Sequence, residues 1–494
     1  MNSSMIRYIL GQVLRIEGVL MLLPCLVAWI YQETEGIVFL GVAVFTFLLG
    51  SLMAMRKPKS QVFYLKEGCV ATALSWILMS FFGSLPFFLS GEIPSLTDAL
   101  FETISGFTTT GASILSDVES LAHCTNFWRC FTHWIGGMGV LVFLLAIVPL
   151  SGGSHINLMR AESPGPSVGK LVPKIKHMAR ILYLIYIGMT LIEIILLLLG
   201  KMPLFDAINI SFGTAGTGGF GIRNDSMASY STYLQWVVTI FMILFGVNFN
   251  AYYMILFHKF KKALIIEEIR YYFLIILASV GFITVSLCQT TFKLADALTH
   301  AAFQVGSIIT TTGFSTVDFN QWSQSCKSVL VLLMFIGACA GSTGGGIKVS
   351  RFVLLVKTVR KELNSYIHPK SIEKIKIDGK PIEHEVVRST NVYFITFMII
   401  FVFSVLLISL EGKSLVTNFT AVAATINNIG PGLAMVGPSQ NFGFFSDFSK
   451  FVLMFDMLAG RLELFPLLIL FHPAIWKETV KNKKKERGNR NGIK

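Results

Sequence analysis

Runs of apolar residues long enough to cross a lipid bilayer recur along the whole chain and constrain its fold more than any other feature. A bilayer core of about 30 Å requires roughly 20 apolar residues in a helix that rises about 1.5 Å per residue. Candidate spans of this kind lie near residues 10–31, 36–54, 68–90, 127–150, 179–200, 232–257, 271–289, 328–357, 391–410 and 448–475. The sequence therefore predicts an all-α polytopic membrane protein with about ten transmembrane helices.

The composition of the chain agrees with a location in the membrane. Of the 494 residues, 53% are hydrophobic and only 14% are Asp, Glu, Lys or Arg, whereas an average soluble domain carries about 25% charged residues. This composition argues against a soluble enzyme, a disordered protein and a nucleic-acid partner, although the net charge is +13. The seven cysteines form no Cys-x-x-Cys pair, so they indicate neither a disulfide framework nor a zinc site.

Lysine and arginine are distributed unequally between the two sides of these spans. They gather in alternate connections and in the C-terminal tail, at residues 56–66, 160–180, 259–270, 351–388 and 477–494. The other connections are acidic or mixed, as in residues 92–119. Because short cytoplasmic loops are enriched in basic residues, the basic set is predicted to be cytoplasmic, together with both termini of the chain.

Four glycine-containing tracts occupy the outward-facing connections. They are tract 1 (residues 108–113), tract 2 (217–220), tract 3 (311–315) and tract 4 (427–432), and their aligned glycines are 108, 94 and 117 residues apart. A period this regular, with a span on each side of every tract, indicates an internal fourfold repeat. Each unit is predicted to be a helix, a re-entrant pore loop and a second helix. Four parallel units can surround one central pore along the membrane normal.

This repeat divides the chain into predicted units. They are two extra N-terminal helices (1–66), pore repeat 1 (67–160), pore repeat 2 (161–262), pore repeat 3 (263–360), a cytoplasmic linker (361–387), pore repeat 4 (388–476) and a basic cytoplasmic tail (477–494).

The four tracts have the residue types that a binding site for a dehydrated cation requires. Non-helical backbone at membrane depth is tolerated only where it lines a cavity or is buried in protein, and glycine permits backbone angles that turn carbonyl oxygens inward. A stack of carbonyl oxygens can replace the hydration shell of K⁺, and the partly negative C-terminal end of a preceding helix favours a cation. The predicted metal-binding filter residues are Thr109, Thr110, Gly111, Thr217, Gly218, Gly219, Thr311, Thr312, Gly313, Asn428, Ile429 and Gly430.

The sequence closely resembles the TrkH/TrkG membrane subunits of bacterial Trk potassium uptake systems, within the Trk/Ktr/HKT superfamily, over nearly its whole length. The motifs that carry the resemblance are residues 108–113, 134–139, 160–162, 337–348, 427–432 and 460–463. It implies a K⁺-translocating homodimer in the bacterial cytoplasmic (inner) membrane, with one pore per subunit. A cytosolic ring of nucleotide-binding TrkA-type subunits would control it, and no nucleotide is expected on this chain. In tract 2 Gly218 and Gly219 are paired, and in tract 4 Asn427 and Asn428 replace threonines, so the filter is not fourfold symmetric.

Residues 341–348, Gly-Ser-Thr-Gly-Gly-Gly-Ile-Lys, allow two interpretations. A phosphate-binding loop requires lysine directly after its second glycine, but Ile347 intervenes and the segment interrupts an apolar span. Three consecutive glycines predict a helix break, and the family resemblance implies that this break is an intramembrane gate; a kink without a gating role is the alternative. The predicted gate residues are Gly341, Gly344, Gly345, Gly346, Lys348 and Arg461.

Arg461 lies near the centre of the last predicted span, where a charge costs about 2.5–3.5 kcal/mol. We expect it to face the pore below the filter and to repel the passing cation. The alternative is a structural ion pair between helices, and Asp456 and Glu463 are the acidic residues in the same span.

Two smaller features carry further predictions. Arg129 is predicted to form a salt bridge with acidic groups on the outer side and to hold the filter region. Residues 370–381 alternate isoleucines with charges and contain Asp378-Gly379, a hairpin signal; the segment is expected either to dock the cytosolic ring or to be a solvated linker.

The sequence thus predicts potassium uptake through a pore, and two other functions remain as alternatives. A proton- or sodium-coupled symporter on the same scaffold requires a titratable or ion-binding group near the pore, for which Asp456 and Glu463 are the candidates in the last span. A membrane-embedded enzyme requires a clustered nucleophile, metal site or acid–base pair. The chain contains neither His-Glu-x-x-His nor Gly-x-Ser-x-Gly, so we predict that it is not an enzyme.

Overall fold

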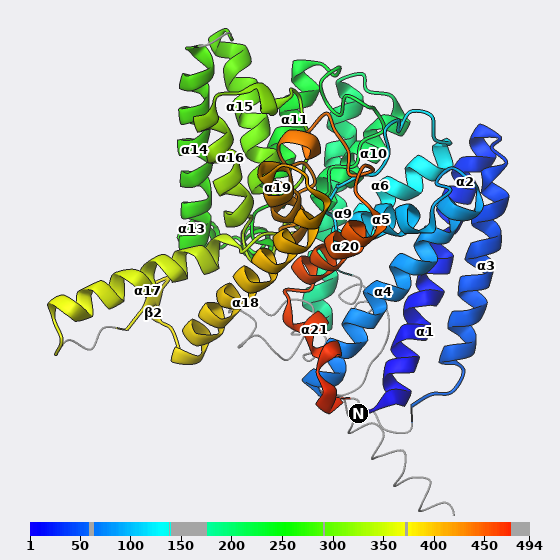
Figure 1. The fold of residues 1–494 in the computed structure, drawn as a ribbon, viewed down its shortest axis with the longest axis horizontal. Coiled ribbons are helices and arrows are strands. Elements are labelled where there is room, and N and C mark those ends of the chain that lie inside the picture. The colour runs from blue at the N-terminus through cyan, green and yellow to red at the C-terminus, as the bar shows by residue number, and fades with distance from the viewer. Residues whose placement is uncertain (59–63, 138, 140–174, 290–291, 371–373, 476–494) are drawn as a thin grey trace, which may run out of the picture.

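The computed structural model describes residues 1–58, 64–137, 139, 175–289, 292–370 and 374–475, and these residues are mostly helical (Figure 1). The helices of the first half are α1 (Ser3–Leu20), α2 (Leu22–Tyr31), α3 (Glu35–Ala54), α4 (Leu65–Leu89), α5 (Leu96–Phe107), α6 (His123–Gly137), α9 (Ile175–Leu199), α10 (Leu204–Gly216), α11 (Thr232–Phe245) and α12 (Phe249–Leu256). Those of the second half are α13 (Phe260–Leu264), α14 (Glu267–Cys288), α15 (Leu294–Ile309), α16 (Gln324–Ile336), α17 (Val349–Ile367), α18 (His384–Ile408), α19 (Leu415–Ile426), α20 (Asp447–Arg461) and α21 (Phe465–Leu468). Short 3-10 turns cover Phe319–Gln321, Ser409–Glu411, Ala434–Val436 and Ile469–Phe471.

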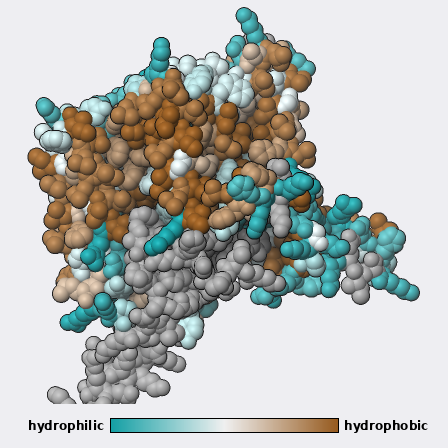
Figure 2. All heavy atoms as spheres, turned by 180° about the vertical axis from the view of Figure 1, so that it is seen from behind, coloured by the Kyte–Doolittle hydropathy of each residue, from teal (hydrophilic) through white to brown (hydrophobic). Residues whose placement is uncertain are grey.

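Long apolar helices confirm the predicted class of all-α membrane protein. Six stretches among the described residues are long and apolar enough to cross a bilayer, and α11 with α12 makes a seventh if the bent pair is one span. The six are Ser3–Tyr31, Glu35–Ala54, Leu65–Leu89, Ala179–Leu199, Glu267–Cys288 and His384–Glu411. Large apolar side chains are exposed along them, such as Ile37 on α3, which is 75% exposed. Figure 2 shows hydrophobic residues covering much of one face, with hydrophilic residues along its edges, as a lipid-facing surface requires.

Two of the predicted spans are not single continuous helices. In the span at 232–257, α11 and α12 meet at 92°, because the side chain of Asn248 accepts a hydrogen bond from the N–H of Asn250 and starts a new helix. In the span at 448–475, Glu463 and Leu464 have left-handed backbones with φ of +55° and +68°, which end α20 and redirect the chain into α21.

A third span is interrupted where the glycines predict it. Helix α16 ends at Ile336 and α17 begins at Val349, and α17 projects sideways from the rest of the molecule in Figure 1. The predicted span near 127–150 is described only as far as the end of α6 and at Gly139. The rest of it, the boundary between repeats 1 and 2 at residues 160 and 161, and the basic tail 477–494 lie outside the described residues.

The Asp378-Gly379 turn forms the predicted hairpin. Strands β1 (Lys376–Ile377) and β2 (Lys380–Pro381) pair antiparallel, with Lys376 opposite Pro381 and Ile377 opposite Lys380. Asp378 and Gly379 both have positive φ, +50° and +72°, as a tight two-residue hairpin requires.

A short helix with one largely buried side precedes each of the four tracts. These helices are α5, α10, α15 and α19, and each ends three or four residues before the tract glycine. In Figure 1, α5, α19 and α20 lie in the middle of the molecule, between α1, α3 and α4 on one side and α14 and α15 on the other. This arrangement places the tracts inside the protein and away from the lipid-facing surface.

Candidate ion pathway

Serine side chains cap the beginning of two of the four helices that lead to the tracts, α5 and α19. The hydroxyl of Ser95 accepts a hydrogen bond from the N–H of Asp98 at the beginning of α5, at 3.3 Å. Ser414 does the same for Thr417 at the beginning of α19, at 3.2 Å. Serine in this position satisfies a free N–H group of the first helical turn. Because each helix runs toward its tract, its partly negative C-terminal end lies beside the tract backbone.

The four tracts share one unusual backbone conformation. Two residues before the glycine the chain is left-handed in every tract, with φ of +54° at Thr109, +52° at Thr217, +59° at Thr311 and +55° at Asn428. The tract glycines are left-handed as well, with φ of +78°, +79°, +92° and +98° in chain order, and the residue between them has a negative φ. A β-branched residue with positive φ is uncommon, and such strain accumulates at functional sites. Three of the four residues are threonines and carry this strain, whereas the fourth, Asn428, adopts the conformation more readily. The same conformation in four separated segments indicates one shared role.

Contacts between the tracts close a ring in chain order. A first side-chain carbon at Gly111 would lie 1.9 Å from the carbonyl oxygen of Gly218, and one at Gly219 would lie 2.1 Å from that of Thr312. A first side-chain carbon at Gly313 would lie 2.2 Å from the carbonyl oxygen of Ile429, and one at Gly430 would lie 2.8 Å from that of Thr110 in tract 1. Each tract glycine therefore faces the backbone of the next tract, and any larger residue at the first three would collide with it. The structure thus brings all twelve predicted filter residues into one ring of four tracts.

Side-chain hydrogen bonds differ between the tracts. In tracts 1 and 3 two threonine hydroxyls pair in the same way, Thr108 with Thr110 at 2.8 Å and Thr310 with Thr312 at 2.7 Å. In tract 4 the Asn428 amide donates to the Thr110 hydroxyl and to the Met457 carbonyl, both at 2.9 Å. The asparagine that departs from the threonine pattern therefore ties tract 4 to tract 1 and to α20.

A buried histidine accounts for the paired glycines of tract 2. His133 on α6 is fully buried, and its Nδ1 lies 2.7 Å from the carbonyl oxygen of Gly106. A first side-chain carbon at Gly218 would lie 2.3 Å from the His133 ring, so the threonine found at the equivalent position of tract 1 has no room here. His133 therefore packs behind the ring, a position that its surroundings in the sequence do not reveal.

The loop 337–348, between α16 and α17, lies directly against tracts 3 and 4. The N–H of Gly345 donates to the hydroxyl of Thr311 at 2.6 Å, and the N–H of Gly346 donates to the carbonyl of Asn427 at 3.1 Å. A side chain at Gly345 would lie 2.3 Å from the same Asn427 carbonyl. The predicted gate glycines are thus in hydrogen-bonding contact with the predicted filter.

Lys348 and Arg461 both bind backbone carbonyls around this loop. The ammonium group of Lys348 donates to the carbonyl of Gly344. The guanidinium group of Arg461 donates to Thr343 in the loop at 2.9 Å, and to Gly136 and Gly137 at the end of α6, the latter at 2.9 Å. Arg461 therefore links the loop to the helix of repeat 1 that follows tract 1.

The two carboxylates considered as partners of Arg461 form other pairs. Glu463 forms a salt bridge with Arg351 on α17, whose guanidinium also lies 4.2 Å from the centre of the Tyr393 ring. Asp456 is buried and accepts a hydrogen bond from Ser404 on α18 at 2.7 Å. These two acidic residues thus connect helices around the ring, and Arg461 is held by main-chain oxygens.

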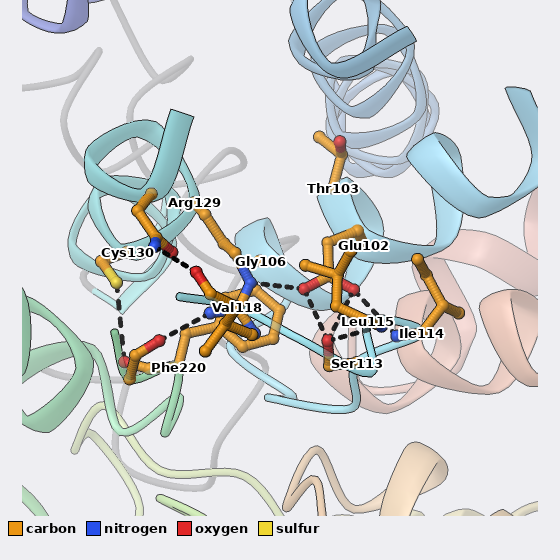
Figure 3. A network of polar contacts seen from close by, with 12 residues as sticks. Glu102, Thr103, Gly106, Ser113, Ile114, Leu115, Val118, Arg129, Cys130 and Phe220 are labelled. Atoms are coloured by element: carbon orange, nitrogen blue, oxygen red, sulfur yellow. Dashed lines mark hydrogen bonds and ion pairs between the residues drawn. The ribbon is translucent and has the colours of Figure 1, made fainter. Parts of the chain in front are cut away.

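Arg129 forms the predicted salt bridge with an acidic residue, and its partner is Glu102. Its Nε lies 2.5 Å from a carboxylate oxygen of Glu102 on α5, and both side chains are buried (Figure 3). The amphipathic pattern of α5 places Glu102 among buried positions. Because buried charges are nearly always paired, a glutamate at such a position indicates a partner of opposite charge.

The beginning of α6, which carries Arg129 and His133, is held by Glu33. The Glu33 carboxylate, between α2 and α3, accepts hydrogen bonds from the N–H groups of His123 and Cys124 at 2.6 and 2.9 Å, and lies 2.8 Å from the His123 ring. Partial burial opposes ionisation, but the hydrogen bonds from Cys124 and His123 outweigh it and lower the pKa of Glu33 below its ordinary value of 4.5. The ionised form is therefore the one that stabilises the fold.

This lowered pKa predicts how stability depends on pH. The stabilisation from Glu33 is complete above pH 4.5 and is lost as the pH falls through the pKa of the folded protein, because the unfolded chain then binds more protons than the folded one. We expect Glu33→Gln to lower the melting temperature at neutral pH, and we expect its difference from the unsubstituted protein to shrink in acid. Thermal unfolding in detergent between pH 3 and pH 7 measures this; a difference that stays constant would contradict it.

Comparison with known proteins agrees with this architecture. The TrkH family model, described as "Cation transport protein", matches residues 36–478. The chain belongs to the TrkH family. The Trk system potassium uptake protein TrkH of Salmonella typhimurium is 35% identical over 487 residues, which cover 97% of this chain and 100% of that protein. The Escherichia coli K12 protein TrkG is 33% identical over 489 residues, which cover 97% of this chain and 100% of TrkG.

A solved member of the family has the same fold. The crystal structure of the potassium transporter TrkH from Vibrio parahaemolyticus matches with a TM-score of 0.87 and 33% identity, covering 96% of this chain and 100% of that one. The predicted resemblance to TrkH and TrkG is therefore confirmed over nearly the full length. The matched family and these relatives are named as transport proteins, which places this chain among membrane transporters.

Proposed function

We propose that this chain is the pore-forming subunit of a Trk-type system and takes up potassium across the cytoplasmic membrane. The observation that carries the proposal is the closed ring of four tracts with one shared left-handed backbone pattern. Glycine permits the left-handed backbone that can turn successive carbonyl oxygens of a tract toward a shared axis. The carbonyl oxygens of the four tracts then replace the hydration shell of K⁺. The four pore repeats and the two N-terminal helices are part of this proposal.

The gate in this proposal is the loop 337–348 together with Lys348 and Arg461. The loop is bound to tracts 3 and 4 through Gly345 and Gly346, and Arg461 holds it to the end of α6. Opening requires these hydrogen bonds to break, after which the loop is free to move from beneath the filter. Its glycines suit such a movement because glycine accepts many backbone conformations.

The distribution of basic residues and the family relatives support our proposal for the orientation, membrane and partners of this chain. We place both termini in the cytoplasm of a bacterium and the chain in its inner membrane, because the basic residues gather in alternate connections and in the tail, as they do in cytoplasmic loops. Surrounding lipid contacts the exposed apolar helices. The relatives are named as parts of a Trk system, which supports a multi-component assembly. In our proposal this is a homodimer, with one pore per subunit, controlled by a cytosolic TrkA-type ring that binds the nucleotide.

The membrane potential is sufficient to drive uptake without coupling to another ion. An interior-negative potential supplies about 2.3 kcal/mol per charge per 100 mV, so about 150 mV sustains a gradient of a few hundredfold. Symport with protons or sodium would require a free titratable or ion-binding group near the pore, for which Asp456 and Glu463 were the candidates in the last span. Asp456 and Glu463 instead contact Ser404 and Arg351, which favours a channel-like pore.

Complementation of a bacterium deficient in potassium uptake tests the proposed function. With a TrkA-type partner present, we expect the chain to restore growth on low potassium and to mediate rapid uptake of radioactive rubidium. Currents across a membrane that contains the chain should reverse at the potassium potential and ignore pH. Failure of rescue despite good membrane expression would contradict the pore function, whereas rubidium uptake driven against its own electrochemical gradient by a proton or sodium gradient would establish the symporter.

A further inference from the structure

An ion pair at the outer ends of tracts 1 and 2 is unusually well enclosed. The side chain of Arg129 is 4% exposed, that of Glu102 is fully buried, and they approach to 2.5 Å. Two opposite charges this close neutralise each other, so neither is available to bind or repel a passing cation. Removing one of them leaves the other as an uncompensated buried charge.

Glu102 holds the chain that follows tract 1. Its carboxylate accepts hydrogen bonds from the Ser113 hydroxyl at 3.0 Å and from the Ile114 N–H at 3.0 Å (Figure 3). These residues come two and three positions after the tract glycine, Gly111. The carboxylate therefore fixes the outer end of tract 1 to α5, the helix that leads into the same tract.

Arg129 holds the chain that follows tract 2. Its Nη1 donates to the carbonyl of Gly221 at 2.8 Å, and its guanidinium lies 3.7 Å from the centre of the Phe220 ring. Phe220 and Gly221 directly follow the tract glycine, Gly219. The planar guanidinium thus binds a carboxylate, a carbonyl and an aromatic face at once, which a lysine cannot reproduce.

The other repeats do not carry a carboxylate at the position of Glu102. Nine residues before the tract glycine they have Ile210, Gln304 and Ala421. Tract 3 is held by a neutral group, since the Ser307 hydroxyl donates to Phe314 and accepts from Gly313. The charged link between two neighbouring tracts is therefore a specific feature of repeat 1 in the ring.

We propose that Glu102 and Arg129 are positioning residues that fix the spacing between tracts 1 and 2 and thereby set the preference of the pore for potassium over sodium. This inference rests on the proposed function of the tracts. A ring held at fixed width cannot contract around the smaller sodium ion. Loosening one of its four junctions permits that contraction, while the remaining junctions keep the pore open to potassium.

Glu102→Gln tests the inference, with purified protein in liposomes and fluxes of rubidium and sodium measured in parallel. We expect the ratio of rubidium to sodium flux to fall about tenfold, which corresponds to about 1.4 kcal/mol, while rubidium uptake persists. Glu102→Asp keeps the charge and should recover most of the ratio. Asp98→Asn is the matched control, because Asp98 lies one turn earlier on α5, farther from tract 1 along the helix. Its carboxylate pairs with the ammonium group of Lys450 on α20 at 2.5 Å. This substitution should leave the ratio unchanged.

A milder substitution covers the case in which Glu102→Gln fails to fold. Ser113→Ala removes the hydroxyl that donates to the Glu102 carboxylate and accepts from the Leu115 N–H, but it leaves the ion pair intact. It should lower the flux ratio in the same direction by a smaller factor. Unchanged ratios in Ser113→Ala and in any folded Glu102→Gln protein would overturn the inference, as would an equal fall in Asp98→Asn. If the unsubstituted protein carries no rubidium, the proposed pore function fails instead, so the two failures are distinguishable.

Discussion

Gly313→Ser is expected to remove most of the preference for potassium, with a fall in the ratio of potassium to sodium transport of about tenfold or more. The backbone of Gly313 has φ of +92°, and a first side-chain carbon would lie 2.2 Å from the carbonyl oxygen of Ile429. A left-handed residue with a side chain costs about 1–2 kcal/mol by itself. Relief of the collision must move tract 4 away from tract 3 and change the width of the ring.

Gly412→Ser is the matched control for this substitution. Gly412 also has a left-handed backbone, with φ of +69°, but nothing lies within 4 Å of the position that a side chain would occupy. Gly412→Ser therefore has the energetic cost of a side chain on a left-handed residue but causes no collision. We expect this variant to keep the normal preference for potassium over sodium. Rubidium and sodium fluxes through both variants, normalised to membrane expression, provide the measurement. An unaltered preference in Gly313→Ser would remove this residue from the filter.

The arrangement of the tracts illustrates what the sequence of this chain predicts well. Each tract has a glycine and a helix-forming segment before it. Both are local signals that can be recognised without any knowledge of the neighbouring repeats. The hairpin at Asp378-Gly379 and the break between α16 and α17 are equally local, since they depend on residues with special backbone preferences.

Contacts between segments that are distant in the chain could not be predicted from the sequence. The bends after Phe245 and Arg461 are marked only by single residues, Gly246, Gly460 and Pro466. Such a residue does not by itself predict a bend, since α4 continues through Pro86. The partner of Arg129 is separated from it by 27 residues, and the partners of Arg461 are main-chain oxygens that have no residue type. A sequence pattern identifies such a charge as significant but does not name what it binds.

Arg461→Ala is expected to raise the rate of rubidium uptake several-fold and to weaken its control by the cytosolic partner. The substitution removes the donors that tie Thr343 in the loop to Gly136 and Gly137 on α6. A charge-assisted hydrogen bond contributes about 1.5–3 kcal/mol, so the loss of even one shifts the balance between a bound and a free loop by about tenfold or more. Uptake measured with and without the partner tests this, and unchanged rates would eliminate the gating role.

Arg461→Lys separates the two ways in which this residue can limit transport. If its charge repels the passing cation, lysine preserves the barrier and uptake stays low. If the planar guanidinium restrains the loop by binding carbonyls on two segments at once, lysine cannot span them and uptake rises toward that of Arg461→Ala. We expect the second result, because the guanidinium contacts both segments. Arg223→Ala, which removes a more exposed pair with Asp206, is the control and should leave uptake unchanged.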